Sequence, residues 1–324
     1  MERIIQVIAA TVLAPAVVIG VVGLADRGVS RLPTGLQRRV RPWVWSAPAL
    51  VLVGAFLGFP LLNTMVLSFR DADGAAFVGA ANYRTVATDP TLRTALRNNA
   101  LWIACFVPAT LTIGLVLALL TDRVRYERLA KTIVFLPMAI SMVATATIWR
   151  FMYDYRPPGS PQTGTVNALY LALGIGDQPE AWLVNTSTNN IAVILAGVWM
   201  LTGLSMVILS AAIKGVPSEL HEAARVDGAN ESTLFFRITL PLIRPAIVLV
   251  VTTLFISSLK TFDVVWVLTN GNFDTGVVGT EIYRQLFSAR HHGRAATLAV
   301  LLLVAATPVI VINVRSHRRE AGHR

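Results

Sequence analysis

The feature that most constrains this chain is a series of long apolar runs. A membrane-spanning helix needs about 20 predominantly apolar residues. The runs that reach this length cover residues 4–24, 44–68, 99–121, 132–153, 190–213, 246–268 and 296–314. Backbone polar groups cannot bond to water inside lipid, so runs of this length fold as helices. The sequence therefore predicts an all-α membrane protein.

Composition supports this prediction and excludes other classes. Hydrophobic residues make up 54% of the 324 residues, charged residues 14%, and the mean hydropathy is +0.61, which is unusual for a soluble domain. The net charge of +10 lies mainly between the apolar runs, as in membrane proteins, and does not indicate nucleic-acid binding. A single cysteine, Cys105, excludes a disulfide framework and a cysteine-based metal site.

The apolar runs and the charged connections suggest three parts. Residues 1–42 form an extra N-terminal helix and an Arg-rich connector, residues 43–314 a core of six helices, and residues 315–324 a basic tail. The first run begins with the nearly neutral Met1-Glu2-Arg3 and lacks a clear cleavage site. We therefore expect a retained helix there and not a secretory signal peptide.

The distribution of Lys and Arg predicts the orientation. Basic residues concentrate in the connector, in residues 123–131, in the loop 214–245 and in the tail, all of which fall on one side. We predict that this side is the cytoplasm and that the amino terminus lies outside. The two longest polar connections, 69–97 and 154–189, are then outside, and their motifs indicate turns.

The loop 214–245 has the signals of two short helices. Pro217 suits a first helical turn and Gly228 suits the left-handed residue that ends a helix, which predicts a helix over 217–227. Asn230 can cap a second segment, 231–239. We expect that segment to end at the prolines that follow, Pro241 and Pro245.

The first of these helices presents a surface suited to a partner. Ala223, Ala224 and Gly228 have little side-chain bulk, so a partner can approach the backbone closely, and Glu222 offers a carboxylate to an arginine across the interface. The alternative is that Glu222 pairs with Arg225 on the same helix, which contributes about 0.2–0.5 kcal/mol.

The chain lacks the motifs of nucleotide hydrolysis and of hydrolytic catalysis. No Gly-x-x-x-x-Gly-Lys-Ser/Thr phosphate loop, no His-Glu-x-x-His pair and no Gly-x-Ser-x-Gly elbow occurs. We expect no catalytic residue, no metal site and no cofactor bound by this chain. Any energy it uses comes from another chain or from an ion gradient.

The spacing in the loop 214–245 resembles a known family motif. Glu222-Ala223-Ala224, Gly228 and Ile238-Thr239-Leu240-Pro241 resemble the EAA loop of the membrane subunits of bacterial ABC importers. Further segments resemble the maltose-type carbohydrate permeases, namely Phe77-Val78-Gly79, Phe135-Leu136-Pro137 and Leu268-Thr269-Asn270-Gly271. The extra first helix, Asn98-Asn99 and Met152-Tyr153-Asp154-Tyr155-Arg156 are most similar to the alpha-glucoside and glucosylglycerol permeases.

This resemblance implies a fold, a function and partners. The fold is a type I ABC importer transmembrane domain of six core helices plus one extra N-terminal helix, in the bacterial inner membrane. The chain forms the pathway for an oligosaccharide or glucoside with a second homologous permease. An extracellular binding protein delivers the sugar, and two ATPase subunits bind ATP and Mg. The residues implied to contact the ATPase are Glu222, Ala223, Ala224, Arg225, Asp227 and Gly228.

The resemblance also places a substrate pathway in two spans. Polar residues inside spans usually face the bundle interior, and sugars need short polar side chains and aromatic faces, such as Phe262 and Trp266. The implied pathway residues are Ser257, Ser258, Lys260, Thr261 and Asp263 in one span, and Leu201, Thr202 and Leu204 in the other.

Structural roles for these residues remain open at this stage. Lys260 and Asp263 can form an ion pair with each other, Ser257 and Ser258 can bond back to the preceding helical turn, and Trp102 can be an anchor at the membrane interface.

Other functions also remain open. One is an ion-coupled secondary transporter with Lys260 and Asp263 as the ion-linked pair. A second is an ABC permease for a polyol, glycerol phosphate or peptide, and a third is a membrane scaffold without transport activity. The sequence leaves the identity of the sugar undecided.

Overall fold

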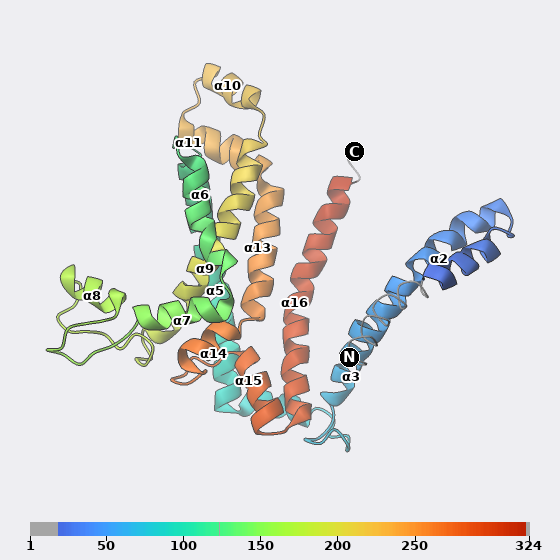
Figure 1. Ribbon diagram of the computed structural model, residues 1–324, viewed down its shortest axis with the longest axis horizontal. Coiled ribbons are helices and arrows are strands. Elements are labelled where there is room, and N and C mark those ends of the chain that lie inside the picture. Colours follow the sequence, from blue (N-terminus) through green and yellow to red (C-terminus); the bar gives the residue numbers. More distant parts are fainter. Residues whose placement is uncertain (1–18, 123, 322–324) are drawn as a thin grey trace, which may run out of the picture. The chain divides into compact units, whose positions relative to one another are not determined.

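The computed structural model describes residues 19–122 and 124–321. Within them the chain is helical, with one isolated antiparallel bridge between Arg70 and Phe77, so the predicted all-α class is confirmed. The chain divides into two compact units, Met1–Val66 and Leu67–Arg324, which we describe separately. Figure 1 shows the elements of each. The predicted division at residues 42 and 314 remains a prediction.

The described part of the first unit is a helical hairpin. Residues 19–29 are helical, and α2 (Thr34–Val53) continues through the π-helix η1 (Gly54–Gly58) into α3 (Phe59–Leu67). Asp26 ties the two arms together, because its carboxylate accepts hydrogen bonds from Arg41 at 2.8 Å and from Trp45 at 3.2 Å. The connector expected before residue 42 is thus largely helical, while most of the expected span 4–24 lies outside the described residues.

Two long helices form the centre of the second unit. They are α5 (Pro90–Thr121) and α9 (Asn189–Lys214), which pack against each other more extensively than any other pair. Asp89 caps α5 by accepting a hydrogen bond from the Leu92 N–H at 3.1 Å. At Gly114 of α5, a Cβ atom would lie 2.5 Å from Cβ of Ser205 on α9. A residue without a side chain is therefore needed for this close approach.

The expected span 132–153 is sharply bent. It consists of α6 (Glu127–Phe135), the 3₁₀-helix η2 (Leu136–Ala139) and α7 (Met142–Met152), with a bend of 102°. Pro137 lies in η2, where it cannot donate to the preceding turn. Ser141 then caps α7 by accepting from the Ala144 N–H at 3.2 Å. The expectation of one continuous helix was wrong because these signals begin a second helix.

The expected span 246–268 is also interrupted. Helix α13 (Arg244–Leu259) ends before residue 260, and α14 (Asp263–Thr269) begins three residues later. Before α13 lie α10 (Ser218–Val226), α11 (Glu231–Leu234), the π-helix η3 (Phe235–Thr239) and α12 (Leu240–Leu242). Pro241 therefore lies inside a helical turn and does not end it.

The remaining elements are α4 (Ala81–Thr88), α8 (Thr165–Ala172), α15 (Val278–Tyr283), the π-helix η4 (Arg284–Ser288) and α16 (His292–Ala321). The first two lie in connections that we expected to consist of turns. Helix α16 contains the last expected span and continues into the expected basic tail as far as Ala321.

The described residues contain four helices long and apolar enough to cross a membrane, and up to six if each bent helix pair counts as one span. The pairs are α6 to α7, and α11 to α13, which is bent by 68°. These spans correspond to the six expected apolar runs after the first. Within the second unit, α10 lies at one end, and α14 and α15 lie at the opposite end (Figure 1).

Candidate functional site

Helix α10 ends in the geometry that the sequence predicted. Gly228 has φ +84°, the Gly228 N–H donates to the Arg225 carbonyl at 3.0 Å, and the Ala229 N–H donates to the Ala224 carbonyl at 2.9 Å. This pair of bonds is a Schellman motif, which satisfies carbonyls at a helix C-terminus. Asn230 caps the next helix by accepting from the Thr233 N–H at 2.8 Å.

The exposed face of α10 contains small and apolar side chains together with acidic ones. Glu222, Ala223 and Asp227 are exposed, and Val226 is 87% exposed. Arg225 forms an ion pair with Glu231 of α11 at 3.0 Å, so the alternative pairing of Glu222 with Arg225 was wrong. The Glu222 carboxylate has no ion-pair partner among the described residues.

Two contacts brace α10 against the segment that follows it. His221 Nε2 lies 3.0 Å from the hydroxyl of Thr239 in η3, and the Arg225–Glu231 pair joins α10 to α11. Thr239 is buried. These contacts make α10, α11 and η3 one connected body at this end of the second unit.

A charged cluster fixes the start of the loop 214–245 to the helix ends beside it. Lys131 Nζ lies 2.6 Å from both Asp122 Oδ1 and Glu127 Oε1, and Lys214 also pairs with Glu127. The basic residues near 123–131 and the loop 214–245 therefore lie at the same end of the unit, as the charge distribution predicted. Which side of the membrane this end faces remains a prediction.

At the other end of α13, a buried asparagine holds the chain where the helix breaks. Asn99 of α5 donates to the Ser258 carbonyl at 3.3 Å and accepts from the Val278 N–H at 2.7 Å. The α15 backbone also lies close to this break, because a Cβ at Gly279 would be 2.7 Å from the Thr261 carbonyl oxygen. The break therefore depends on residues far away in the sequence.

A small cavity adjoins the break. It has a volume of about 20 Å³, which holds about one water molecule, so a sugar ring can enter only if the surrounding helices separate. Two of its lining side chains are almost fully buried, and their polar atoms, Trp102 Nε1 and Thr145 Oγ1, have no hydrogen-bond partner among the described residues. Unpaired buried polar groups are rare in native structures, and the rest of the lining is mostly apolar.

The cavity includes part of the expected substrate pathway. Ser257, Thr261 and Leu201 line it, together with the ring of Phe262. The Ser258 hydroxyl instead donates to the Phe255 carbonyl at 2.7 Å, as its structural alternative predicted.

The other expected pathway residues do not line the cavity. The Thr202 hydroxyl donates to the Val198 carbonyl at 2.7 Å, while Leu204, Lys260 and Asp263 are not among the lining residues. In the part of the chain that the structure describes, Lys260 and Asp263 form no ion pair with each other. A substrate role for these residues remains a prediction.

Sequence reasoning missed Trp102 and Thr145. Trp102 is 2% exposed, so the interpretation of this residue as an interface anchor was wrong. Thr145 lies on α7, and only the bend before α7 brings it to the cavity. Gly197, a glycine inside an apolar span, was a usable signal, because a Cβ there would be 2.9 Å from the Trp102 ring.

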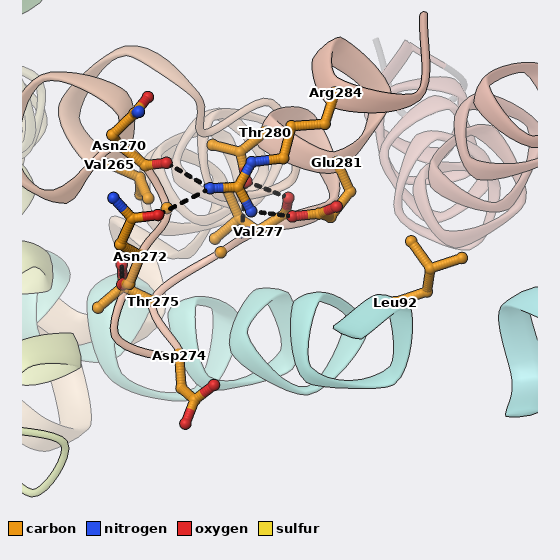
Figure 2. A network of polar contacts seen from close by, with 12 residues as sticks. Leu92, Val265, Asn270, Asn272, Asp274, Thr275, Val277, Thr280, Glu281 and Arg284 are labelled. Carbon is orange, nitrogen blue, oxygen red and sulfur yellow. Dashed lines mark hydrogen bonds and ion pairs between the residues drawn. The ribbon is translucent and has the colours of Figure 1, made fainter. Parts of the chain in front are cut away.

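A network of polar contacts holds the turn between α14 and α15 (Figure 2). Arg284 pairs with Glu281 at 2.8 Å and donates to the Asn270 carbonyl at 2.6 Å. Glu281 is 3% exposed, and burial raises the pKa of its carboxyl group although Arg284 opposes the shift. From α5, Asn98 donates to the carbonyls of Asp274 and Gly276 at 2.7 and 2.8 Å.

Replacing Asn99 by leucine should destabilise the chain by about 2 kcal/mol or more, because the buried Val278 N–H would lose its partner and the Ser258 carbonyl would lose one of its hydrogen bonds. Thermal unfolding in detergent measures the effect. Asn190→Leu is the matched control, since its amide reaches the Asp274 carbonyl at 3.4 Å from an exposed position, and we expect a change within about 0.5 kcal/mol. Equal losses in the two variants would contradict the proposed contribution of Asn99.

The bent and straight spans, the braced loop at one end and the cavity beside the helix break at the other define a membrane-spanning transport subunit. Residues 110–321 match the family described as binding-protein-dependent transport system inner membrane component. The chain belongs to this family.

Relatives and a solved structure agree with the assignment. The osmoprotective compounds uptake permease protein GgtC of Synechocystis is 45% identical over 277 residues, which are 86% of this chain and 99% of that protein. The alpha-glucoside transport system permease protein AglF of Rhizobium meliloti is 41% identical over 289 residues, which are 89% and 85% of the two chains. A chain of a bacterial ABC transporter involved in the import of the polysaccharide alginate has the same fold, with a TM-score of 0.73, 24% identity and coverage of 88% and 98%.

Proposed function

We propose that this chain is the permease subunit of an ATP-driven, binding-protein-dependent importer of an oligosaccharide or glucoside. The observation that carries the proposal is α10, a short braced helix with an exposed face of small, apolar and acidic residues, at the opposite end of the unit from α14, whose Val264 lines the cavity. An exposed apolar face of this kind is typical of a docking surface.

The proposed partners follow from the family and from this surface. A second permease completes the pathway, a binding protein delivers the cargo outside, and two ATPase subunits that bind ATP and Mg dock on α10 and on its counterpart. In this proposal the loop 214–245 and the carboxyl terminus face the cytoplasm and the amino terminus lies outside. The exposed Glu222 pairs with a basic side chain of the ATPase, and Ala223, Arg225 and Asp227 contribute to the same interface.

Coupling requires two conformations whose balance both the ATPase and the cargo change. A shift from mostly one conformation to mostly the other needs about 5.5 kcal/mol of differential binding. In our proposal, ATP binding by the ATPase pair and docking of the loaded binding protein together supply this energy.

Purification from mild detergent tests the assembly. We expect the chain to bring with it a second permease and an ATPase, and the ATPase activity of the reconstituted complex to rise when loaded binding protein is added. A chain that purifies alone and transports its cargo without ATP would contradict the proposal and favour an ion-coupled transporter.

A second candidate cargo is a small osmoprotective solute. It is favoured by the 45% identity to GgtC, an osmoprotective compounds uptake permease. Thermal-shift screening of the cognate binding protein against alpha-glucosides and against glycosylated polyols separates the two, because a ligand that binds the folded protein stabilises it by an amount that grows with the logarithm of ligand concentration over Kd. A shift with polyol glycosides alone would assign the cargo to the second class.

A further inference from the structure

Four aromatic rings form a continuous row at the α14–α15 end of the second unit. The rings of Phe262 and Trp266 stack with centroids 5.4 Å apart and planes at 20°. The centroid of the Tyr283 ring lies 4.7 Å from that of Trp266 and 5.7 Å from that of Phe262, and the Phe287 ring lies 4.8 Å from that of Tyr283. We call these four residues the aromatic row.

The row leads from the cavity to an exposed surface. Phe262 lines the cavity together with Ser257 and Thr261. At the other end, Tyr283 is 38% exposed and Phe287 is 63% exposed. The row therefore connects an exposed surface to the cavity at the break between α13 and α14.

The backbone that carries the outer rings is held rigidly. Arg284, which follows Tyr283, bonds both to the buried Glu281 and to the Asn270 carbonyl, as Figure 2 shows. Phe287 lies in the π-helix η4, a type of turn that is frequent at functional sites. The polar network thus fixes the backbone beside Tyr283, while the outer rings of Tyr283 and Phe287 remain exposed.

We propose that the aromatic row is a stacking surface for the pyranose rings of the cargo on their way to the cavity. This inference rests on the proposed function in sugar import. A pyranose has an apolar C–H face that packs on an aromatic ring, and its hydroxyls remain free for polar partners such as the Tyr283 hydroxyl. Rings that are isolated anchors in lipid need no such continuity with an internal cavity.

The test measures sugar imported per ATP hydrolysed by the complete complex in vesicles, at saturating loaded binding protein. We expect Phe287→Leu and Tyr283→Leu each to lower this ratio by about 2- to 10-fold, the range that one aromatic contact provides. Phe287→Tyr keeps a ring and should restore the ratio. Phe151→Leu is the matched control, because Phe151 is also exposed, at 73%, but is outside the row.

Three results would overturn the inference in different ways. If the complex imports sugar and the ratio is unchanged in both leucine variants, the stacking surface is contradicted but the proposed function is not. Loss of the second permease during purification of these variants shows that the rings form a subunit contact. Failure of the wild-type complex to import any glucoside or polyol glycoside overturns the proposed function itself, and the stacking surface with it.

Discussion

Gly228→Val should lower import by about 5- to 30-fold while the chain still assembles in the membrane. Gly228 has φ +84°, a conformation that costs a residue with a side chain roughly 1–2 kcal/mol, and a β-branched residue fits it poorly. This energy changes the population of the correct turn by a factor of about 5–30. The substitution should therefore move α10 relative to the Asn230 cap and disturb the proposed docking of the ATPase. Transport of labelled sugar into vesicles measures the effect.

A second glycine provides a matched control for this variant. Gly159 has φ +86°, and a Cβ atom added at either glycine would meet nothing within 4 Å. Both substitutions to valine thus introduce the same backbone strain without a clash, but Gly159 lies in the connection 154–189. We expect Gly159→Val to import at close to the wild-type rate. Equal loss in the two variants would show that general strain, and not the position of Gly228, is responsible.

Arg284→Met should destabilise the second unit by about 3–5 kcal/mol, because it leaves the buried Glu281 carboxylate without its partner. The thermal midpoint in detergent measures the change. The double variant Glu281→Gln, Arg284→Met should recover most of the loss, since no charge then remains buried. As a control, Arg156→Met removes an ion pair to Asp154 with both side chains about half exposed, for which we expect at most about 1 kcal/mol.

The pKa of Glu281 determines how the loss of stability in Arg284→Met depends on pH. Burial raises the pKa of Glu281 above its ordinary value near 4.5, while Arg284 lowers it. A raised pKa in the folded state means that stability is greatest below the ordinary value and is lost as the pH rises through the raised pKa. Removing Arg284 raises the pKa further, so the destabilisation by Arg284→Met should shrink as the pH falls. A penalty that stays constant with pH would contradict the assignment to the buried carboxylate.

Local signals explain why much of the loop and of the spans was predictable. Gly228, Asn230 and the apolar lengths act through the residues next to them, because caps and turns form between neighbours in the chain. These predictions agree with α10, with the cap of α11 and with α5 and α9. The family resemblance rests on the same loop and is confirmed by the match over residues 110–321.

The interruption of the span 246–268 was not predictable from its own residues. It depends on Asn99, which is about 160 residues away, and on the close approach of α15 at Gly279. The cavity likewise needs Trp102 from α5 and Thr145 from α7. Tyr283 and Phe287 gave no periodic signal of their own, and only the turn between α14 and α15 brings them to Trp266.

Helix α13 connects the loop 214–245 to the cavity. It begins at Arg244, next to the braced loop, and ends at Leu259, next to the cavity. Its 16 residues span about 24 Å at 1.5 Å per residue, and a helix is stiff along its axis. In the proposed coupling, an axial displacement of the loop would therefore reach Ser257 almost undiminished. Residues 260–262 are not helical, so they are the point at which α14 would change its direction relative to α13.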